Sequence, residues 1–98
     1  MVNDKKKITG NTDPVINKML NAFIKNKKKD INRIESDLKN NNYDSIYDLS
    51  HQLKGAGSLY GLNRISEIGI LLEKASLSGD SGSIRKLCTK LEKYLNQL

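Results

Sequence analysis

Apolar residues recur with helical spacing along almost the whole chain. From about residue 13 to the C-terminus they return every three or four positions, and no segment shows the alternation typical of a half-buried strand. The pattern therefore predicts an all-α protein. The predicted buried stripes are Ile16, Leu20, Phe23, Ile31, Ile34 and Leu38; Ile46, Leu49, Leu53, Ala56 and Tyr60; Ile65, Ile68, Leu72 and Ala75; and Ile84, Leu87, Cys88, Leu91, Tyr94, Leu95 and Leu98.

The first predicted helix is the longest. Pro14 is favourable at a first helical position, and Asp13 before it is a suitable N-cap. The apolar stripe is interrupted by the wholly polar stretch Lys25–Asp30, where the helix either overhangs the core or breaks. We favour one continuous helix that is allowed to kink at this stretch. Asn40–Asn42 form the following turn, with Asn42 as the expected N-cap of the next helix.

The second and third helices are predicted to form a tight hairpin. They are expected over about residues 43–60 and 63–78, with Gly61 and Leu62 as the connection. A connection of this length leaves no room for a parallel arrangement, so the two helices must be antiparallel neighbours.

A similar short connection precedes the fourth helix. Gly79 is the expected end of the third helix, and Asp80 or Ser81 the N-cap of the fourth. These connections predict an antiparallel up-down-up-down four-helix bundle over residues 13–98. Residues 1–12 are polar and carry almost no apolar periodicity, so we expect a flexible, disordered tail there.

Length and cysteine count narrow the class of protein. With 98 residues the chain allows a single domain, and with only Cys88 it allows no internal disulfide and no Cys/His metal site. No run of apolar residues is long enough to cross a membrane, and the N-terminus lacks the apolar centre of a secretory signal. We therefore expect a cytoplasmic protein without a membrane partner. Met1 and the polar tail favour a separate protein over a piece of a larger kinase.

The charge is positive and unevenly distributed. The chain carries 17 Lys and Arg against 11 Asp and Glu, a net charge of +6, with most of the excess in the first helix and the tail. Such a balance suits nucleic acid, an anionic membrane or an acidic protein. The lysines at 25, 27, 28 and 29 are the main argument for a nucleic-acid-binding domain. Because they lack interleaved aromatic residues and a recognition-helix motif, we do not expect a nucleic-acid partner.

The stretch Ser50–Gly61 carries the candidate chemistry. On a helix that turns by about 100° per residue, His51 points away from the predicted buried stripe and into solvent. The residues expected on the same face are Asp44, Tyr47, Asp48, Lys54, Gly55 and Ser58.

Each neighbour of His51 has a physical use. A neutral imidazole is a nucleophile near neutral pH. Lys54, at i+3, can offset the negative charge of an arriving phosphoryl group, and Gly55, at i+4, leaves room for a partner to approach. A glycine inside a helix costs about 1 kcal/mol relative to alanine, so helix stability does not explain Gly55 and Gly57. Gly57 lies at the edge of the buried stripe, where it favours close helix packing.

The hairpin also predicts a partner for the histidine. In antiparallel helices about a turn near position 62, facing residues have numbers that sum to about 124, which places Glu73 opposite His51. A carboxylate there could accept the imidazole Nδ1–H, fix the tautomer and leave Nε2 as the attacking nitrogen. We therefore assign Glu73 the role of orienting His51.

These residues resemble a known motif. The sequence His51-Gln52-Leu53-Lys54-Gly55, followed by Gly57 and Gly61, is similar to the H-x-L-K-G signature of histidine-phosphotransfer domains, the family that includes the phosphorylated domain of chemotaxis kinases. The likeness extends from about Asp13 to Leu98, including the apolar pattern of the first helix and the Leu72-Glu73 pair. The lysine-rich stretch at 25–29 departs from the family pattern.

The resemblance implies a function. It implies phosphorylation of His51 at Nε2, assistance from Lys54, and a glutamate or glutamine at the position of Glu73. It also implies that a receiver domain docks over the face of the second helix, where Gly55 leaves it room. From this face, the residues expected to contact the receiver are Tyr47, Asp48, Gln52, Gly55 and Ser58.

The expected protein is a phosphocarrier in a two-component phosphorelay rather than an enzyme. The chain has no glycine-rich nucleotide loop and no kinase motif set, so any ATP-dependent step belongs to another protein. We expect no cofactor, a monomer, and receiver domains of response regulators or hybrid kinases as partners, with Mg²⁺ bound on the receiver. The alternative from the same class is a bundle that binds receivers without accepting phosphate.

Overall fold

Four helices make up the part of the chain that the structure describes. The computed structural model describes residues 14–98, apart from the side chains of Pro14 and Ile16. The helices are α2 (Pro14–Lys39), α3 (Tyr43–Leu59), α4 (Asn63–Leu77) and α5 (Ser81–Gln97), and these residues form no strand. The predicted tail over residues 1–12, the Asp13 cap and the packing of Ile16 lie outside the described residues.

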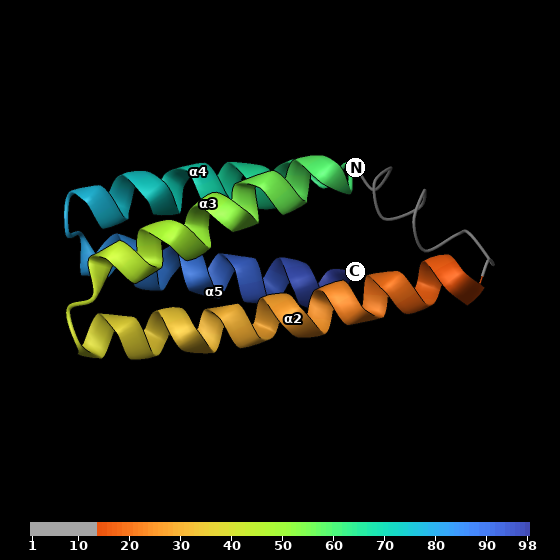
Figure 1. Cartoon of the computed structure of the whole chain (residues 1–98), viewed down its shortest axis with the longest axis horizontal. Coiled ribbons are helices and arrows are strands. Elements are labelled where there is room, and N and C mark those ends of the chain that lie inside the picture. The colour runs from red at the N-terminus through yellow and green to blue at the C-terminus, as the bar shows by residue number, and fades with distance from the viewer. Residues whose placement is uncertain (1–13) are drawn as a thin grey trace.

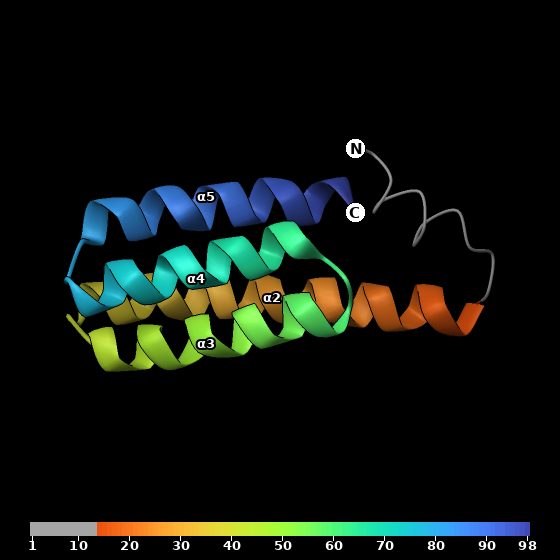
Figure 2. The same ribbon diagram turned by 90° about the horizontal axis from the view of Figure 1, so that it is seen from above.

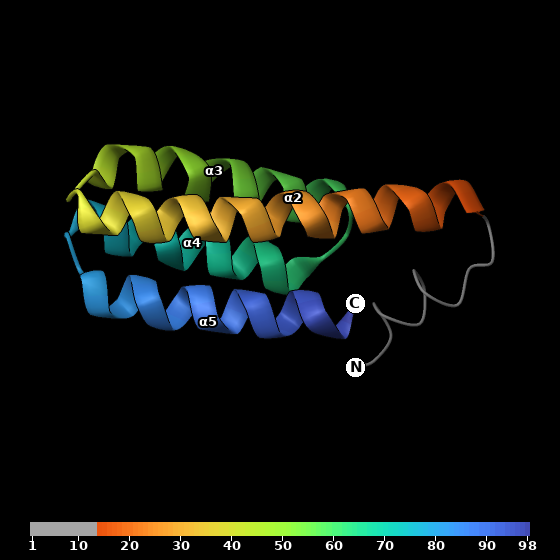
Figure 3. The ribbon, with the colours of Figure 1, turned by 90° about the horizontal axis from the view of Figure 1, so that it is seen from below.

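Each helix runs opposite to the one before it, as Figure 1 shows. Helix α4 lies between α3 and α5, and α2 lies alongside both α3 and α5, so that the four helices enclose one core (Figures 2 and 3). The predicted all-α four-helix bundle is thus confirmed. The predicted ends of the second and third helices differ from the observed ends by one residue each.

The three connections share one backbone geometry. A residue with positive φ follows each of the first three helices: Asn41 (φ 54°), Gly61 (φ 70°) and Gly79 (φ 66°). The amide of the next residue then donates to a carbonyl five residues back, for example from Leu62 to Gly57 at 2.8 Å. This is the Schellman arrangement, which ends a helix and reverses the chain within two or three residues.

Two polar side chains fix where the next helix begins. The Asn42 side chain accepts a hydrogen bond from the Ser45 amide at the start of α3, and the Asp80 side chain accepts one from the Ser83 amide at the start of α5. Asn42 is the predicted N-cap, and Asp80 is one of the two residues predicted for the fourth helix. Helix α4 has no side-chain cap; Leu62 occupies that position and is fully buried instead.

The core is built from the predicted stripes. The members that are less than a tenth exposed are Leu20, Phe23, Ile31, Ile34, Leu38, Ile46, Leu49, Leu53, Ile65, Ile68, Leu72, Ala75, Ile84, Cys88, Leu91 and Leu95. Leu62, which was predicted as part of a connection, is fully buried with them, and Ala56, Leu87, Tyr94 and Leu98 are partly buried at the edge of the core. Burial raises the pKa of the Cys88 thiol to about 11, with Glu35 and Glu92 adding to the effect, so this thiol stays neutral near pH 7. Cys88 therefore acts as a packing residue.

Helix α2 runs without interruption through the polar stretch. Residues 25–30 are helical throughout, so the favoured prediction of a continuous helix is confirmed. Within the stretch, Lys27 forms an ion pair with Asp30 at 2.9 Å and lies over the Phe23 ring. The first turns of α2 extend beyond the ends of the other helices (Figure 2). None of the helices in the described part of the chain has the length and hydropathy of a membrane span.

The prediction that Tyr60 is buried is wrong. This residue was expected in the buried stripe of the second helix, but it is 38% exposed and its ring packs against Phe23, with 4.7 Å between ring centroids. The physical reason is that α3 ends at Leu59, so that the backbone at Tyr60 leaves the helical path. A rotation of about 100° per residue no longer describes its direction.

Candidate functional site

The site is built on an unusually close approach of α3 and α4. A Cβ atom added to Gly57 would lie 2.5 Å from the backbone nitrogen of Ser66, and one added to Gly69 would lie 2.7 Å from that of Lys54. Real Cβ atoms do not come this close to backbone, so only glycine fits at either position. The expected packing role of Gly57 is therefore seen in the structure.

Small polar side chains complete this interface. Ser66 on α4 donates a hydrogen bond to the carbonyl of Lys54 on α3 at 3.0 Å, and Ser58 and Ser66 share a hydroxyl contact at 3.1 Å. Ser50, which is fully buried, donates to the Ile46 carbonyl within its own helix and so needs no partner across the interface. The backbone of α3 is thereby held in a fixed register against α4 at Lys54, three residues from His51.

His51 stands on the outer side of this interface. Its side chain is 62% exposed, and its Nδ1 lies 2.7 Å from the Glu73 carboxylate on α4. Because an ionised carboxylate only accepts, Nδ1 carries the proton and donates it to this bond. In neutral imidazole, Nε2 then holds the lone pair. The hydrogen bond expected from the hairpin register is present in the structure.

Glu73 joins His51 to Lys54. Its second carboxylate oxygen lies 3.3 Å from the Lys54 ammonium, and its side chain is only 12% exposed. The hydrogen bond from His51 lowers the pKa of the Glu73 carboxyl below its ordinary value; Lys54 contributes to the lowering, and partial burial opposes it. Glu73 is therefore ionised near pH 7, with one oxygen on the imidazole and the other near the cation.

The remaining predicted residues surround the histidine on α3. The Tyr47 ring, one turn before His51, is nearly parallel to the imidazole, with 6.4 Å between centroids. Together with Asp48 and Gln52 these two rings line a shallow recess. Asp44, Asp48, Gln52, Gly55 and Ser58 are exposed, and Tyr47 is half-buried.

Gly55 differs from the two packed glycines. A Cβ added there would meet no atom within 4 Å, so nothing in the bundle requires glycine at this position. The surface beside His51 consequently has a stretch of bare backbone next to a half-buried cation.

The site has no metal-binding cluster and no enclosed cavity among the described residues. In residues 14–98, no group of three or more His, Cys, Asp and Glu side chains is arranged to hold a metal ion. The face around His51 is a shallow surface rather than an enclosed substrate cavity, which suits a macromolecular partner.

The sequence interpretation missed Gly69 and Ser66. Gly69 allows the close approach that brings Glu73 to His51, and Ser66 bonds the two helices together. A signal for Gly69 was available, because a glycine between Ile68 and Ile70 in a helix costs about 1 kcal/mol and calls for a packing reason. No comparable signal marks Ser66, since serine is common on exposed helix faces.

Comparison with known proteins agrees with this geometry. The family model described as "Hpt domain" matches residues 18–98, which is most of the chain. Neither the curated proteins nor the solved structures returned a match. The family match covers α2 from residue 18 onward and the whole of α3, α4 and α5, and it includes His51, Lys54 and Glu73. The chain therefore belongs to the Hpt domain family, the histidine-phosphotransfer domains.

Proposed function

We propose that His51 carries a phosphoryl group between aspartates of receiver domains. The observation that carries this proposal is the hydrogen bond between His51 Nδ1 and Glu73 on an imidazole that is 62% exposed. It combines a fixed tautomer with access for a macromolecular partner. Family membership supports the same class of chemistry.

The proposed transfer is a displacement at phosphorus. The Nε2 lone pair attacks the phosphorus of an aspartyl phosphate on the receiver, an N–P bond forms, and the bond from phosphorus to the aspartate oxygen breaks. The electron pair of that bond leaves with the aspartate carboxylate. The reverse sequence returns the phosphoryl group to another receiver.

Glu73 and Lys54 act on the two charges that the step creates. Attack by Nε2 makes the imidazole ring cationic while Nδ1 keeps its proton, and the carboxylate of Glu73 at 2.7 Å stabilises that cation. Lys54, one turn along the same helix face, offsets the negative charge of the phosphoryl group. Mg²⁺ and the acidic pocket that binds it are expected on the receiver.

The partner is proposed to dock over the exposed face of α3. Its reacting aspartate must come within bonding distance of an imidazole, so the backbone around it must also come close. Gly55 provides the space for this approach, and Asp48, Gln52 and Ser58 provide exposed polar groups around it. Tyr47 borders the recess on the other side of His51.

The direct test is phosphoryl transfer from purified receivers. Receiver domains are phosphorylated with a small-molecule phosphodonor and Mg²⁺, freed of donor, and incubated with this protein and with its His51→Gln variant. We expect an acid-labile, base-stable label on the natural chain and none on the variant. His51 is the only histidine, so the position is unambiguous. Receivers that bind but leave no label would contradict the proposal and favour the binding-only alternative.

A second variant tests the docking face. Gly55→Arg places a long side chain on the surface next to the imidazole without entering the bundle, because nothing lies within 4 Å of a Cβ at this position. We expect transfer to slow by about a hundredfold or more, the scale of a misplaced reaction partner. Unchanged thermal unfolding would show that the fold is intact. Normal transfer by this variant would remove Gly55 from the docking face.

A further inference from the structure

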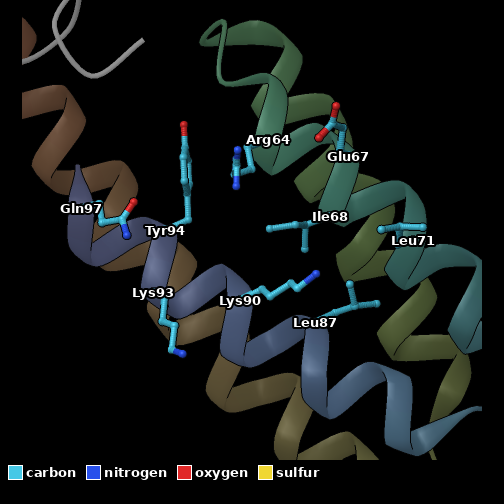
Figure 4. A pocket seen from close by; sticks show the side chains of 9 residues that line it. All are labelled: Arg64, Glu67, Ile68, Leu71, Leu87, Lys90, Lys93, Tyr94 and Gln97. Atoms are coloured by element: carbon cyan, nitrogen blue, oxygen red, sulfur yellow. The ribbon is translucent and has the colours of Figure 1, made fainter. Parts of the chain in front are cut away.

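A second surface lies on the other side of α4, where it faces α5. Two recesses follow each other along these helices and share Leu71, Leu87 and Lys90. Figure 4 shows the first of them, with side chains from both helices around it. We call the two recesses together the α4–α5 groove. The groove does not include His51, Lys54, Gly55 or Glu73, so it is separate from the candidate site.

The floor of the α4–α5 groove is apolar. Ile68, Leu71 and Ala75 line it from α4, and Leu87 lines it from α5. Ile68 and Ala75 are buried, so the apolar surface that a partner can reach is chiefly that of Leu71, which is 47% exposed, and of the half-buried Leu87. Leu71 is a large apolar side chain that the bundle itself leaves uncovered on one side. Apolar surface of this kind, rimmed by polar residues, is typical of a protein-binding groove.

The rim is strongly basic. The cations that line the groove are Arg64, Lys74, Lys86, Lys90 and Lys93, against the acidic residues Glu67 and Asp80. The ion pairs of residues 14–98 include none of these five cations, although the charge of Lys86 contributes to lowering the pKa of the Asp80 carboxyl. Arg64 lies over the Tyr94 ring at 5.9 Å, and Lys90 extends across the groove toward α4 (Figure 4). Asp80 is already engaged as the N-cap of α5, through Ser83.

The length and direction of the groove fit an α-helix. The groove follows two antiparallel helices from Arg64 to Ser78 on one side and from Ser83 to Gln97 on the other. At 1.5 Å per residue, this is a length of about 21 Å, which corresponds to a helix of about 14 residues. A helix laid between two others places a stripe of apolar residues on the floor and its flanks against the rim.

We propose that the α4–α5 groove binds an acidic amphipathic helix of a partner protein. Leucine-like side chains of that helix contact Leu71 and Leu87, and its flanking carboxylates face Arg64 and Lys74 on one side and Lys86 and Lys90 on the other. Charge complementarity carries this choice, because a second copy of the chain in a symmetric pair would set the same basic rim against itself. The surface does not include His51, so the proposal holds independently of phosphotransfer.

The test uses a synthetic peptide as the probe. The peptide has about 15 residues, with leucine at every third or fourth position and glutamate on both flanks of that stripe. A second peptide of the same composition has its leucines redistributed so that no apolar face forms. Binding to the full chain is measured by titration and mapped by amide chemical shifts. We expect the largest shifts on α4 and α5 along the groove, and weaker binding of the redistributed peptide by at least about tenfold.

Matched variants separate the floor from the rest of α4. Leu71→Asp changes a groove residue, and Ile70→Asp changes its neighbour, which is 39% exposed but does not line the groove. We expect the first to raise the Kd by at least about tenfold and the second by less than about threefold. Equal effects of the two changes would overturn the proposal.

A second pair separates the rim from the overall charge. Lys86→Glu with Lys90→Glu reverses two rim cations four residues apart, and Lys25→Glu with Lys29→Glu makes the same change on α2. We expect at least about tenfold weaker binding for the first pair and less than about threefold for the second. An equal loss of affinity in both double variants would show that only the net charge of the protein matters, and would overturn the proposal. Shifts confined to α2 or α3, no binding of either peptide, or groove-dependent binding of phosphatidylserine vesicles in place of the peptide would each overturn the proposal.

Discussion

Helix α4 makes two very different contacts with its neighbours. Toward α3, Gly57 and Gly69 let backbone approach backbone, and Ser66 bonds across the interface. Toward α5, a recess runs along the surface and is lined by side chains of both helices, including Leu71 and Leu87. One helix thus has a closely packed side, which carries His51 and its partner, and an open side, which carries the groove.

The difference shows what each kind of site requires of its scaffold. The bond between His51 and Glu73 spans two helices at 2.7 Å, so a shift of one helix by 1 Å would break it. Closely approaching backbone cannot shift by that amount without collision. Gly57 and Gly69 therefore help to fix the distance between His51 and Glu73. A groove for another helix tolerates more, because apolar contacts have no strict direction. The closely packed side should therefore be the more sensitive of the two to small changes in packing and in backbone spacing.

The largest effect is expected at Leu53 of α3. This side chain is 2% exposed in the core beside the site, and Leu53→Ala should lower the free energy of unfolding by about 2–5 kcal/mol because a cavity is left. The loss is measured by chemical denaturation. A loss below about 1 kcal/mol would contradict the importance of this contact.

Leu91→Ala is the matched control. Leu91 is 1% exposed in the same core but belongs to α5 rather than to α3 or α4, and its truncation should cost a similar amount. The two variants should differ in the nitrogen chemical shifts of His51, which report the Nδ1–H tautomer. Only Leu53→Ala should alter them, because α3 carries the imidazole. Identical shifts in both would show that core packing behind α3 does not position the histidine.

A smaller effect is expected from one methyl group at Gly69. Gly69→Ala places a Cβ 2.7 Å from the Lys54 backbone nitrogen, so the helices must separate, at a cost of about 1–3 kcal/mol. Gly55→Ala makes the same chemical change where no atom lies within 4 Å, and should stabilise the protein by about 0.5–1 kcal/mol through helix propensity. Thermal unfolding of both variants gives the comparison. If the two changes had the same sign, close backbone approach would not be the property that distinguishes the α3–α4 side.

The elements of the fold could be predicted because their signals are local. Asn42 and Asp80 cap helices by bonding amides three residues away, and Gly61 and Gly79 supply the positive φ that ends a helix. Such signals act within a few residues of sequence, so the second and third helices were located to within one residue at their ends. The predicted burial of Tyr60 was wrong because this residue lies one position past the end of α3, where the rotation per residue of a helix no longer applies.

The candidate site could be predicted only in part. The position of Glu73 opposite His51 could be predicted because a two-residue turn between antiparallel helices allows one register, and the facing residues then follow from their sequence numbers. Gly69 was not found, because its importance depends on the distance between helix axes, which periodicity does not contain. The α4–α5 groove was missed for the same reason. It depends on how the side chains of two helices meet at the surface, which periodicity along one helix does not contain.

The smallest effect is expected from the charge on Glu73. Glu73→Gln keeps an oxygen that can accept from His51 but removes the negative charge. The pKa of Glu73 is lowered in the folded protein, chiefly by the bond from His51, so its ionised form stabilises the fold at pH values above the ordinary 4.5. That contribution is lost as the pH falls below 4.5 toward the folded-state pKa, where the carboxyl becomes protonated in both states. We therefore expect the variant to melt a few degrees lower at pH 6, and the gap to close as the pH falls below about 4.5. Asp80, whose pKa is also lowered by its bonds to Ser83, is present in both proteins and cancels in the difference. A gap of constant size down to pH 3 would show that the α3–α4 side is held by the geometry of this bond rather than by its charge.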